Sequence, residues 1–530
     1  MVSLNPAYSP PARKKLLSVM KAEVEAHDHK AKAIILKSEY KIAITVDTWT
    51  SVNANCSMLA ITAHVANEAF AERSNLLLDC ISLEEESHSA VQIEEKIRES
   101  FRRLDIDVSR VKFFVADGAT VMKSAASNLN VKYVQCCAHV INLAAKAAME
   151  LECAKKAVQK VKKIVSRLNR SGKAKAVYKR FLQEANLPNV LPSSDCPTRW
   201  GSTYTMICDV LNTLPAIENV VNHLSMTPFE KEELRFLEAI QCFLAPFYTV
   251  TKQVCRQNSC ISMYIAVGKI LIASTRKSCM SAKQEAKQFG DMLLSKLRHY
   301  FDEWFEDETL WMASFMDPRF AFLDTVLSME AWRETVERLK RTKVPSTMNE
   351  SDCSPSPSAG KDLPVWNVLK ETETSGFDKA NTKNDEFEIE IQQYAIALKR
   401  ARPEFDSDPF KWWRSHRHKF PNIYKMVSEY LVSPASSVDC ERLFRQGGMI
   451  YGNKRRGRLR GENTRLLLMI KAQGNEEIGR VSKAWSPAEA KMYGAPPKMA
   501  SLFGDVSESS SSDEESVLSS DEENSSQSSS

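Results

Sequence analysis

The chain has 530 residues and is 43% hydrophobic, enough for two or more globular domains with a sizeable core. It contains no run of about eighteen apolar residues and no apolar segment near its start, so we expect neither a transmembrane helix nor a secretory signal. The 13 cysteines form no C-x-x-C pair, which argues against a disulfide framework or a zinc finger and favours a reducing compartment. The net charge is +5, but the last 26 residues hold eight acidic and no basic residues, so the remaining body carries +13. Such a basic body suggests a polyanionic partner, and nucleic acid is the leading candidate.

A buried strand that ends on a carboxylate is predicted within the stretch 41–51, KIAITVDTWTS, after a helical arm over residues 1–40. Ile42, Ile44 and Val46 fill one face and smaller residues fill the other, as in a central strand. We expect the strand to end at Asp47, which would fix a carboxylate at the mouth of a cleft. The alternative is that this aspartate only begins a turn.

The following block alternates between strand and helix patterns and contains a second aspartate, Asp117, directly after a strand. This order is typical of ribonuclease-H-like folds, in which the first and fourth strands are neighbours, so the two aspartates would meet at one edge of the sheet. The predicted strands cover 57–66, 73–83, 111–116 and 131–135, and the predicted helices cover 89–104 and 137–163.

The second half of the chain has helical patterns without strand signals. The pattern runs from about residue 204 to 343 and resumes from 386 to about 473, while 343–384 is polar and predicts a flexible loop. The end of the chain is a low-complexity run of Ser, Asp and Glu that we expect to be disordered. Ser512 and Ser520 each have a glutamate three positions later, which suits an acidophilic kinase such as casein kinase 2; the alternative is a plain solubilising tail.

Three further clusters could carry chemistry, and each has a simpler structural reading. Cys136-Cys137-Ala138-His139 has too few ligands for a structural zinc, so the histidine alone reads as a core residue. Arg199 and Trp200 follow a proline turn and could grip a phosphate and stack on a base, or simply pack. In 434–444, PASSVDCERLF, a serine can cap a helix that carries Glu441, and an isolated glutamate is usually a solvated residue.

Taken together, these motifs resemble one family. The order VDTWTS, ADGATVM, CCAH, RW, MDPRF, WW and YLVSPASSVDCERLF is similar to the hAT superfamily of DNA transposases, in the branch that includes BED-type zinc finger proteins. The resemblance extends from about residue 40 to 474 and is most specific in the C-terminal segment, which resembles the hAT dimerisation region.

The resemblance implies an α/β plus all-α protein, in which a ribonuclease-H-like mixed sheet is interrupted by a large helical insertion. It implies that Asp47, Asp117 and Glu441 form an acidic triad that binds Mg²⁺ or Mn²⁺ and cleaves and joins DNA strands. The implied division of the chain is a helical arm at 1–40, the first part of the core at 41–203, the insertion at 204–385, the dimerisation region completing the core at 386–474, and a tail at 475–530.

Other roles follow from the same resemblance. His139 and Trp200 match residues beside the scissile phosphate and a flipped base, and Arg199 accompanies them. A homodimer or higher oligomer is implied, and the matching dimerisation residues are Trp412, Trp413, Tyr430, Leu431 and Phe444.

Two features depart from the family or extend it. No Cys/His set suitable for a BED finger precedes residue 40, so either the chain is truncated or it recognises DNA elsewhere. A basic run interleaved with glycine predicts phosphate contacts, or else a solvated loop, and it could also serve as a nuclear localisation signal; its cations include Lys454, Arg455, Arg456 and Arg458.

From the motifs and the resemblance together, we expect either a metal-dependent DNA transposase or a catalytically silent nuclear regulator of transcription that descends from one.

Overall fold

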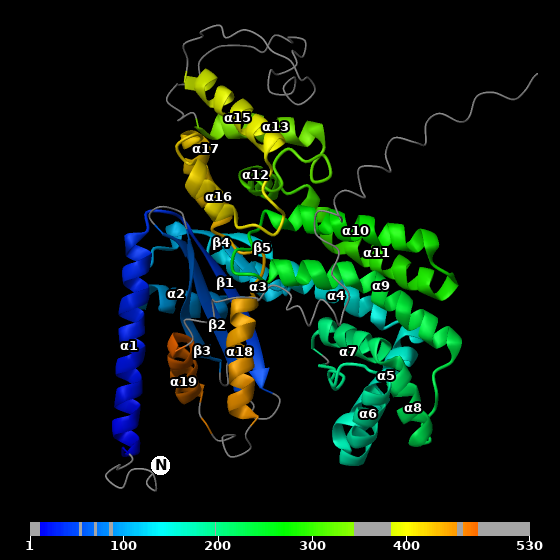
Figure 1. Ribbon diagram of the computed structural model, residues 1–530. Helices are drawn as coiled ribbons and strands as arrows, with labels where there is room; N and C mark the ends of the chain where they lie inside the picture. Colours follow the sequence, from blue (N-terminus) through cyan, green and yellow to red (C-terminus); the bar gives the residue numbers. More distant parts are fainter. Residues whose placement is uncertain are drawn as a thin grey trace, which may run out of the picture.

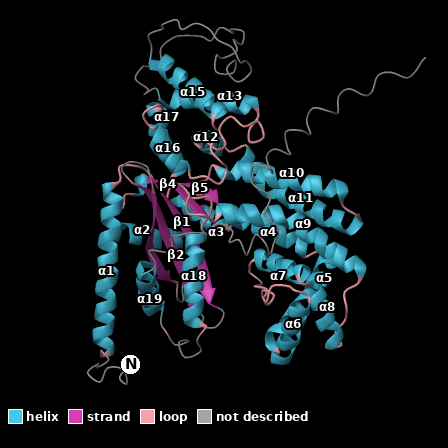
Figure 2. Ribbon diagram, viewed as in Figure 1, coloured by secondary structure: helices cyan, strands magenta, loops and turns pink. Residues whose placement is uncertain are grey.

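A five-stranded mixed sheet forms the centre of the protein in a computed structural model, which describes residues 11–51, 56–67, 72–83, 88–196, 198–343, 383–452, 459 and 461–474. The sheet order is β3-β2-β1-β4-β5 (Figures 1 and 2). β2 runs antiparallel to both β1 and β3, whereas β4 runs parallel to both β1 and β5. The strands are β1 (Ile42–Ser51), β2 (Cys56–Ala66), β3 (Arg73–Ser82), β4 (Val111–Ala116) and β5 (Lys132–Gln135).

Helices surround the sheet and extend well beyond it. In Figure 1, α5 to α8 form a lobe at the lower right, while α12, α13 and α15 to α17 lie above the sheet. No helix within the described residues is long and apolar enough to cross a membrane. The helices are α1 (Arg13–Lys37), α2 (Ala90–Leu104), the 3-10 turn η1 (Val108–Arg110), α3 (Thr120–Asn128), α4 (Cys137–Met149), α5 (Glu152–Arg170), α6 (Gly172–Glu184), α7 (Trp200–Asn212), α8 (Leu214–His223), α9 (Lys231–Val254), α10 (Met263–Ser281), α11 (Gln284–Phe305), α12 (Glu308–Met316), α13 (Met329–Lys343), α15 (Lys383–Arg400), α16 (Pro409–His416), α17 (Pro421–Leu431), α18 (Val438–Tyr451) and α19 (Gly461–Gly474).

The two faces of the sheet are covered by different helices. Alternation along β1 turns Ile42, Ile44 and Val46 to one face, where they join the buried side chains of α2 and α3. On the other face, Phe113 and Val115 of β4 pack with α4. On that same face, the β2 and β3 side chains pack with α18 and α19, so the end of the chain completes the layer that α4 begins.

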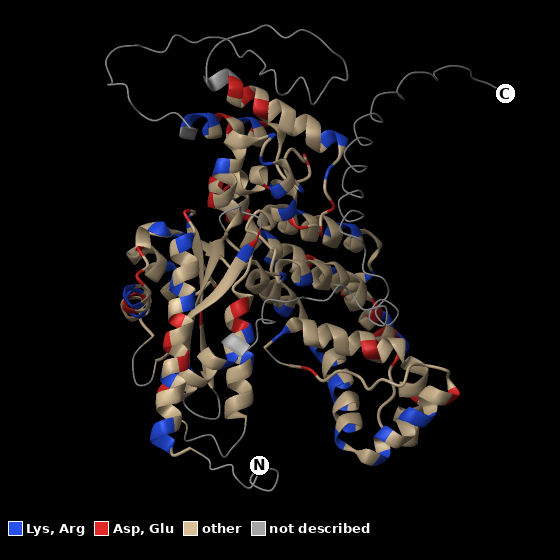
Figure 3. Ribbon diagram, turned by 60° about the vertical axis from the view of Figure 1, so that its left-hand side comes forward, with Lys and Arg blue, Asp and Glu red and all other residues tan. Residues whose placement is uncertain are grey.

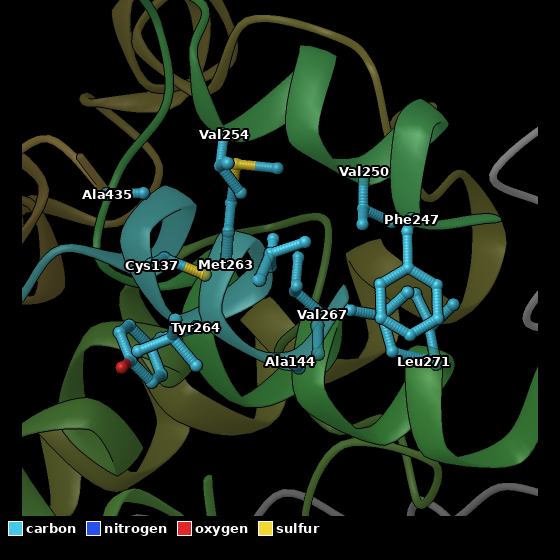
Figure 4. Close-up of a cluster of buried hydrophobic side chains, with 14 of the residues drawn as sticks. Cys137, Ala144, Phe247, Val250, Val254, Met263, Tyr264, Val267, Leu271 and Ala435 are labelled. Atoms are coloured by element: carbon cyan, nitrogen blue, oxygen red, sulfur yellow. The ribbon is translucent and has the colours of Figure 1, made fainter. Parts of the chain in front are cut away.

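The helical part shares one continuous core with the α4 side of the sheet. Figure 4 shows Ala144 of α4 among Val250 of α9 and Val267 of α10, all of them buried. Cys137 and Ala435 lie at the edge of the same cluster, although they are far apart in the sequence. The insertion is therefore packed onto the sheet layer rather than tethered to it.

The predicted elements are confirmed, with two corrections. The predicted helix over 137–163 is two helices, because the backbone at Leu151 is extended (ψ 140°) and α5 begins anew after it. The first strand does not end at Asp47: β1 continues to Ser51, since its outer part pairs with β2 alone. The predicted loop over 343–384, apart from its ends, and the predicted tail from 475 lie outside the described residues.

Candidate functional site

Two aspartates lie where β1 and β4 part. The parallel pairing of these strands ends at Thr45 opposite Val115, and continuing the same register by two residues sets Asp47 against Asp117. The Asp47 carboxylate accepts a hydrogen bond from the Thr48 N–H at 2.8 Å. The Asp117 carboxylate likewise accepts the Ala119 N–H at 3.2 Å. Both side chains therefore lie at one edge of the sheet and are held by local backbone contacts.

Helix α18 brings a third carboxylate to this edge. Thr45 and Trp49 flank Asp47 on the same face of β1, and both touch α18. The Thr45 hydroxyl lies 3.4 Å from the Cys440 sulfur, and the Trp49 and Phe444 rings stack with centroids 5.9 Å apart. Glu441 follows Cys440 and therefore lies near the end of the β1–β4 pair, although it is almost 400 residues from β1 in the sequence.

The charges of these residues are coupled. The pKa of Asp47 is raised to about 8, chiefly because the carboxyl is buried and then because Glu441 and Asp117 are negatively charged. The Thr48 hydrogen bond offsets only part of this rise. The structure thus concentrates negative charge around a half-buried carboxyl group, an arrangement that favours either a retained proton or a cation.

The donor set suits a hard divalent cation, but Glu441 is engaged elsewhere. Within the described residues, no three side chains of His, Cys, Asp or Glu are grouped closely enough to hold a metal ion. The Nη2 atom of Arg199 lies 3.2 Å from Oε2 of Glu441, and the two side chains are 52% and 38% exposed. An ion pair this exposed contributes only ~0.2–1 kcal/mol, so it can be exchanged for another partner. Carboxylates such as those of Asp47, Asp117 and Glu441 are the type of oxygen ligand that Mg²⁺ and Mn²⁺ prefer.

The Cys-Cys-Ala-His motif joins the start of α4 to the loop before α18. The Cys137 N–H donates to the Ala435 carbonyl at 3.0 Å, and the Ser437 N–H donates to the Cys136 sulfur at 3.4 Å. Burial raises the pKa of the Cys136 thiol to about 11, so it stays protonated and serves as a packing group. His139 follows on the first turn of α4 and is partly buried. The sequence motif thus holds the segment that delivers Glu441, a role that sequence analysis missed.

Trp200 is part of a buried aromatic cluster in this conformation. Its side chain is 3% exposed, and its ring lies within 6.0 to 6.4 Å of the rings of Tyr204, Phe247 and Tyr248. Its backbone N–H donates to the Asn142 side chain of α4 at 3.2 Å. The simpler reading, packing, therefore describes the tryptophan here, whereas its neighbour Arg199 is exposed and contacts the candidate site.

The predicted dimerisation residues contact the rest of their own chain. Trp413 is fully buried, donating its indole N–H to the Met316 carbonyl at 2.8 Å, and Leu431 is also buried. Trp412 is partly buried and stacks on His416 at 3.9 Å. Tyr430 packs against Phe113 of the sheet, and Phe444 against Trp49, as described above. Trp412 and Tyr430, which are partly exposed, are the ones of this set that a partner could still reach.

The predicted basic run falls outside the described residues, and a larger basic surface was missed. Lys454, Arg455, Arg456 and Arg458 are not described. Between residues 152 and 184, however, the chain has eleven Lys and Arg residues and two Glu residues, all on α5 and α6. The signal in the sequence was the spacing of cations by three, four and seven positions along one helix.

Comparisons with known proteins agree with the family resemblance. Residues 134–241 match the ZBED1 RNase-like helical domain, and residues 390–473 match the hAT family C-terminal dimerisation region. The described helices α4 to α8 lie within the first match, and α16 to α18 lie within the second. The chain thus carries two regions that match models of the ZBED1 helical domain and of the hAT dimerisation region.

Individual relatives support the same assignment. The chain is 22% identical over 357 residues to zinc finger BED domain-containing protein 4 of Homo sapiens, covering 63% of this chain and 28% of that protein. It is 22% identical over 500 residues to the "Putative AC transposase" of Zea mays (87% and 59%) and 25% identical over 259 residues to the Hobo transposase of Drosophila melanogaster (46% and 37%). The chain is therefore a homologue of hAT transposases and BED zinc finger proteins, and it spans between 28% and 59% of these relatives.

Proposed function

We propose that this chain is a nuclear, transposase-derived DNA-binding protein that keeps a metal-dependent site for cutting and joining DNA strands. The observation that carries the proposal is the coupling of Asp47, Asp117 and Glu441, two of them at adjacent parallel strands and the third on α18. The sheet order β3-β2-β1-β4-β5, with β4 beside β1, supports a ribonuclease-H-like core. Two relatives that are named as transposases support the reaction class.

The chemistry assigns a role to each residue around the proposed site. Asp47, Asp117 and Glu441 would hold two Mg²⁺ or Mn²⁺ ions, which neutralise charge on the attacking and leaving oxygens of a phosphodiester. Asp47 must give up the proton that its raised pKa favours before it can serve as a ligand. Arg199 must leave Glu441, and a DNA phosphate is a suitable new partner for its guanidinium.

Metal-dependent cleavage tests this proposal. A labelled DNA duplex is incubated with Mg²⁺ or Mn²⁺ and with wild-type protein, Asp47→Asn or Asp107→Asn. We expect cutting by the wild type and by Asp107→Asn, because Asp107 is an exposed aspartate that caps a 3-10 turn. Cutting should fall to background in Asp47→Asn, because Asn cannot supply a charged ligand. Equal cutting by all three proteins would show that Asp47 is not part of a catalytic site.

A second function, a catalytically silent regulator of transcription, is favoured by one contact. The Arg199–Glu441 ion pair occupies the third carboxylate in the described conformation, and one relative is a zinc finger BED protein rather than a named transposase. If the wild type binds DNA but never cuts it with either metal, the regulator is the better reading.

The dimerisation region is proposed to pair two copies of the chain, and the two tryptophans separate that role from packing. Trp413→Ala removes a fully buried ring, so we expect ~3–5 kcal/mol of destabilisation in urea unfolding. Trp412→Ala removes a partly exposed ring and should weaken self-association in sedimentation while leaving the monomer folded. A folded Trp412→Ala protein that remains fully dimeric would remove this tryptophan from the interface.

A further inference from the structure

The hairpin of α5 and α6 is strongly basic, and it lies outside the predicted acidic site. Residues 152–184 carry a net charge of +9 over 33 residues. In Figure 3, the lobe at the lower right, which holds these helices, shows more blue than red. This charge is concentrated where neither the family match nor the relatives' names assign a ligand.

The cations of α5 are ordered along one face of the helix. Buried apolar residues such as Val161, Ile164 and Leu168 turn one side to the core. On the opposite side, Lys156, Lys163, Arg167 and Arg170 follow one another at intervals of seven, four and three residues. With a rise of 1.5 Å per residue, this stripe is about 21 Å long.

Many of these cations lack an acidic partner. Lys156 pairs with Glu152 at 3.4 Å, and Arg180 pairs with Glu184 at the same distance. Lys155, Lys160 and Lys162 of α5 also have acidic partners. The remaining cations of the two helices form no ion pair within the described residues; they are Lys163, Arg167, Arg170, Lys173, Lys175 and Lys179. Six unneutralised cations on one hairpin repel one another, so a polyanion would bind there with a gain in free energy.

A cavity beside α5 includes the arginine that contacts the candidate site. This cavity of about 250 Å³ lies between α4, α5 and α7, and its lining includes four cations, Lys146, Lys155, Lys162 and Arg199, and two carboxylates, Glu150 and Asp195. Glu150 pairs with Lys155 at 2.9 Å. Lys162 holds Asp195 at 2.9 Å, and the Asn169 side chain donates to Ser194 at 2.9 Å, so the segment before α7 is fixed along α5. The same segment ends at Arg199, which touches Glu441.

We propose that the α5–α6 surface binds the phosphate backbone of double-stranded DNA and directs the duplex toward the candidate site. This inference rests on the proposed function, because it takes the site's substrate to be DNA. At 3.4 Å per base pair, the stripe matches about six base pairs of one strand. Contacts of this kind position a duplex without reading its sequence.

Matched charge-removal variants test the proposal. The test variant changes Lys163, Arg167, Arg170 and Lys173 to Gln. The control variant changes Arg276, Lys283, Lys287 and Arg298 to Gln, which removes the same charges from exposed positions on or beside α10 and α11. Affinity for two labelled duplexes of unrelated sequence is measured by fluorescence anisotropy over a range of salt concentrations. Circular dichroism verifies that each variant is folded.

We expect the test variant to lose at least tenfold in affinity for both duplexes. Its salt slope should fall by roughly 3.6, because four phosphate contacts are lost and each contributes about 0.9 to the slope. The control variant should lose less than threefold. Equal losses in the two variants would overturn the inference while leaving the proposed function intact. A wild-type protein that binds neither duplex would instead overturn the proposed function. If the test variant does not fold, Arg167→Gln with Arg170→Gln is compared with Arg276→Gln and Arg298→Gln by the same criteria.

Discussion

Two aspartates of the chain, Asp317 and Asp47, lie in contrasting electrostatic surroundings. Asp317 follows α12 and is fully buried; it accepts hydrogen bonds from the Arg319 guanidinium at 2.6 and 2.8 Å and from the Ser262 hydroxyl at 2.6 Å. Asp47, at the β1–β4 edge, has two other carboxylates around it and no cation of its own among its described contacts. Arg319 also donates to the Ser407 carbonyl. The Asp317 carboxylate therefore belongs to a buried hydrogen-bonded unit in which its charge is matched by a guanidinium.

This difference separates a structural carboxylate from one that is available for chemistry. A buried charge that only supports the fold is accompanied by its counter-charge, because leaving it alone costs several kcal/mol. A buried carboxyl whose neighbours are also acidic keeps a proton or waits for a cation. The contrast can be tested by removing the counter-charge in one place and the charge itself in the other.

The largest effect is expected at Arg319. Arg319→Met keeps much of the side-chain volume but leaves Asp317 buried without a partner, so we expect a loss of ~3–5 kcal/mol in the free energy of unfolding. Urea denaturation followed by tryptophan fluorescence measures it. The control is Arg338→Met, whose arginine pairs with Glu308 and Glu334 at the surface and should cost less than ~1 kcal/mol. If the two variants lost equal stability, the buried hydrogen-bonded unit around Asp317 would have no special role.

A smaller effect is expected at Asp47, and its sign depends on pH. The folded-state pKa of about 8 lies above the ordinary value of 3.8, so between these values the folded protein holds a proton that the unfolded chain releases. The stability of the wild type should therefore fall as the pH rises through this window. Asp47→Asn cannot ionise, so its Tm relative to the wild type should rise with pH and be at least roughly 2 °C higher at pH 8.

Two comparisons make this measurement specific. Asp107→Asn should not gain stability with rising pH, because the pKa of Asp107 is lowered by its hydrogen bonds to Ser109. Added Mn²⁺ should raise the Tm of the wild type at pH 8 and leave that of Asp47→Asn unchanged, since binding to the folded state stabilises it. A Tm difference that stays constant from pH 4 to pH 8 would contradict the raised pKa.

The smallest effect is expected at Arg199. Arg199→Ala frees Glu441 from a half-exposed ion pair worth ~0.2–1 kcal/mol, so Mn²⁺ should bind about 1.4- to fivefold more tightly by isothermal titration calorimetry. Arg180→Ala breaks a comparable surface pair with Glu184 and should leave Mn²⁺ affinity unchanged. Weaker Mn²⁺ binding by Arg199→Ala would show that the arginine supports the site rather than competing with the metal.

The sheet could be predicted from the sequence because its signals are local. Apolar patterns indicated the strands themselves. The order of elements, which is typical of ribonuclease-H-like folds, predicted that the first and fourth strands are neighbours, and β1 and β4 do pair. The exact end of β1 could not be predicted, since it depends on β2, which pairs with the outer half of the strand. The break between α4 and α5 was missed for a similar reason, because apolar spacing continues through Leu151 while the backbone does not.

The candidate site was only partly visible in the sequence. Glu441 could be joined to the two aspartates through the family resemblance alone, because nothing local relates α18 to β1. The contact of Arg199 with Glu441 joins positions 242 residues apart and has no sequence signal of its own. The basic face of α5, by contrast, was present as a periodic pattern and could have been found by plotting charge on a helix.

The contact between β1 and α18 also sets the time at which the site can form during synthesis. Thr45 and Cys440 are 395 residues apart, so the ribosome must add nearly the whole chain before Glu441 can reach the two aspartates. At 5–20 residues per second, this takes roughly 20 to 80 s. Until then a nascent chain carries the sheet edge without its third carboxylate, and any product that ends before α18 cannot assemble the site.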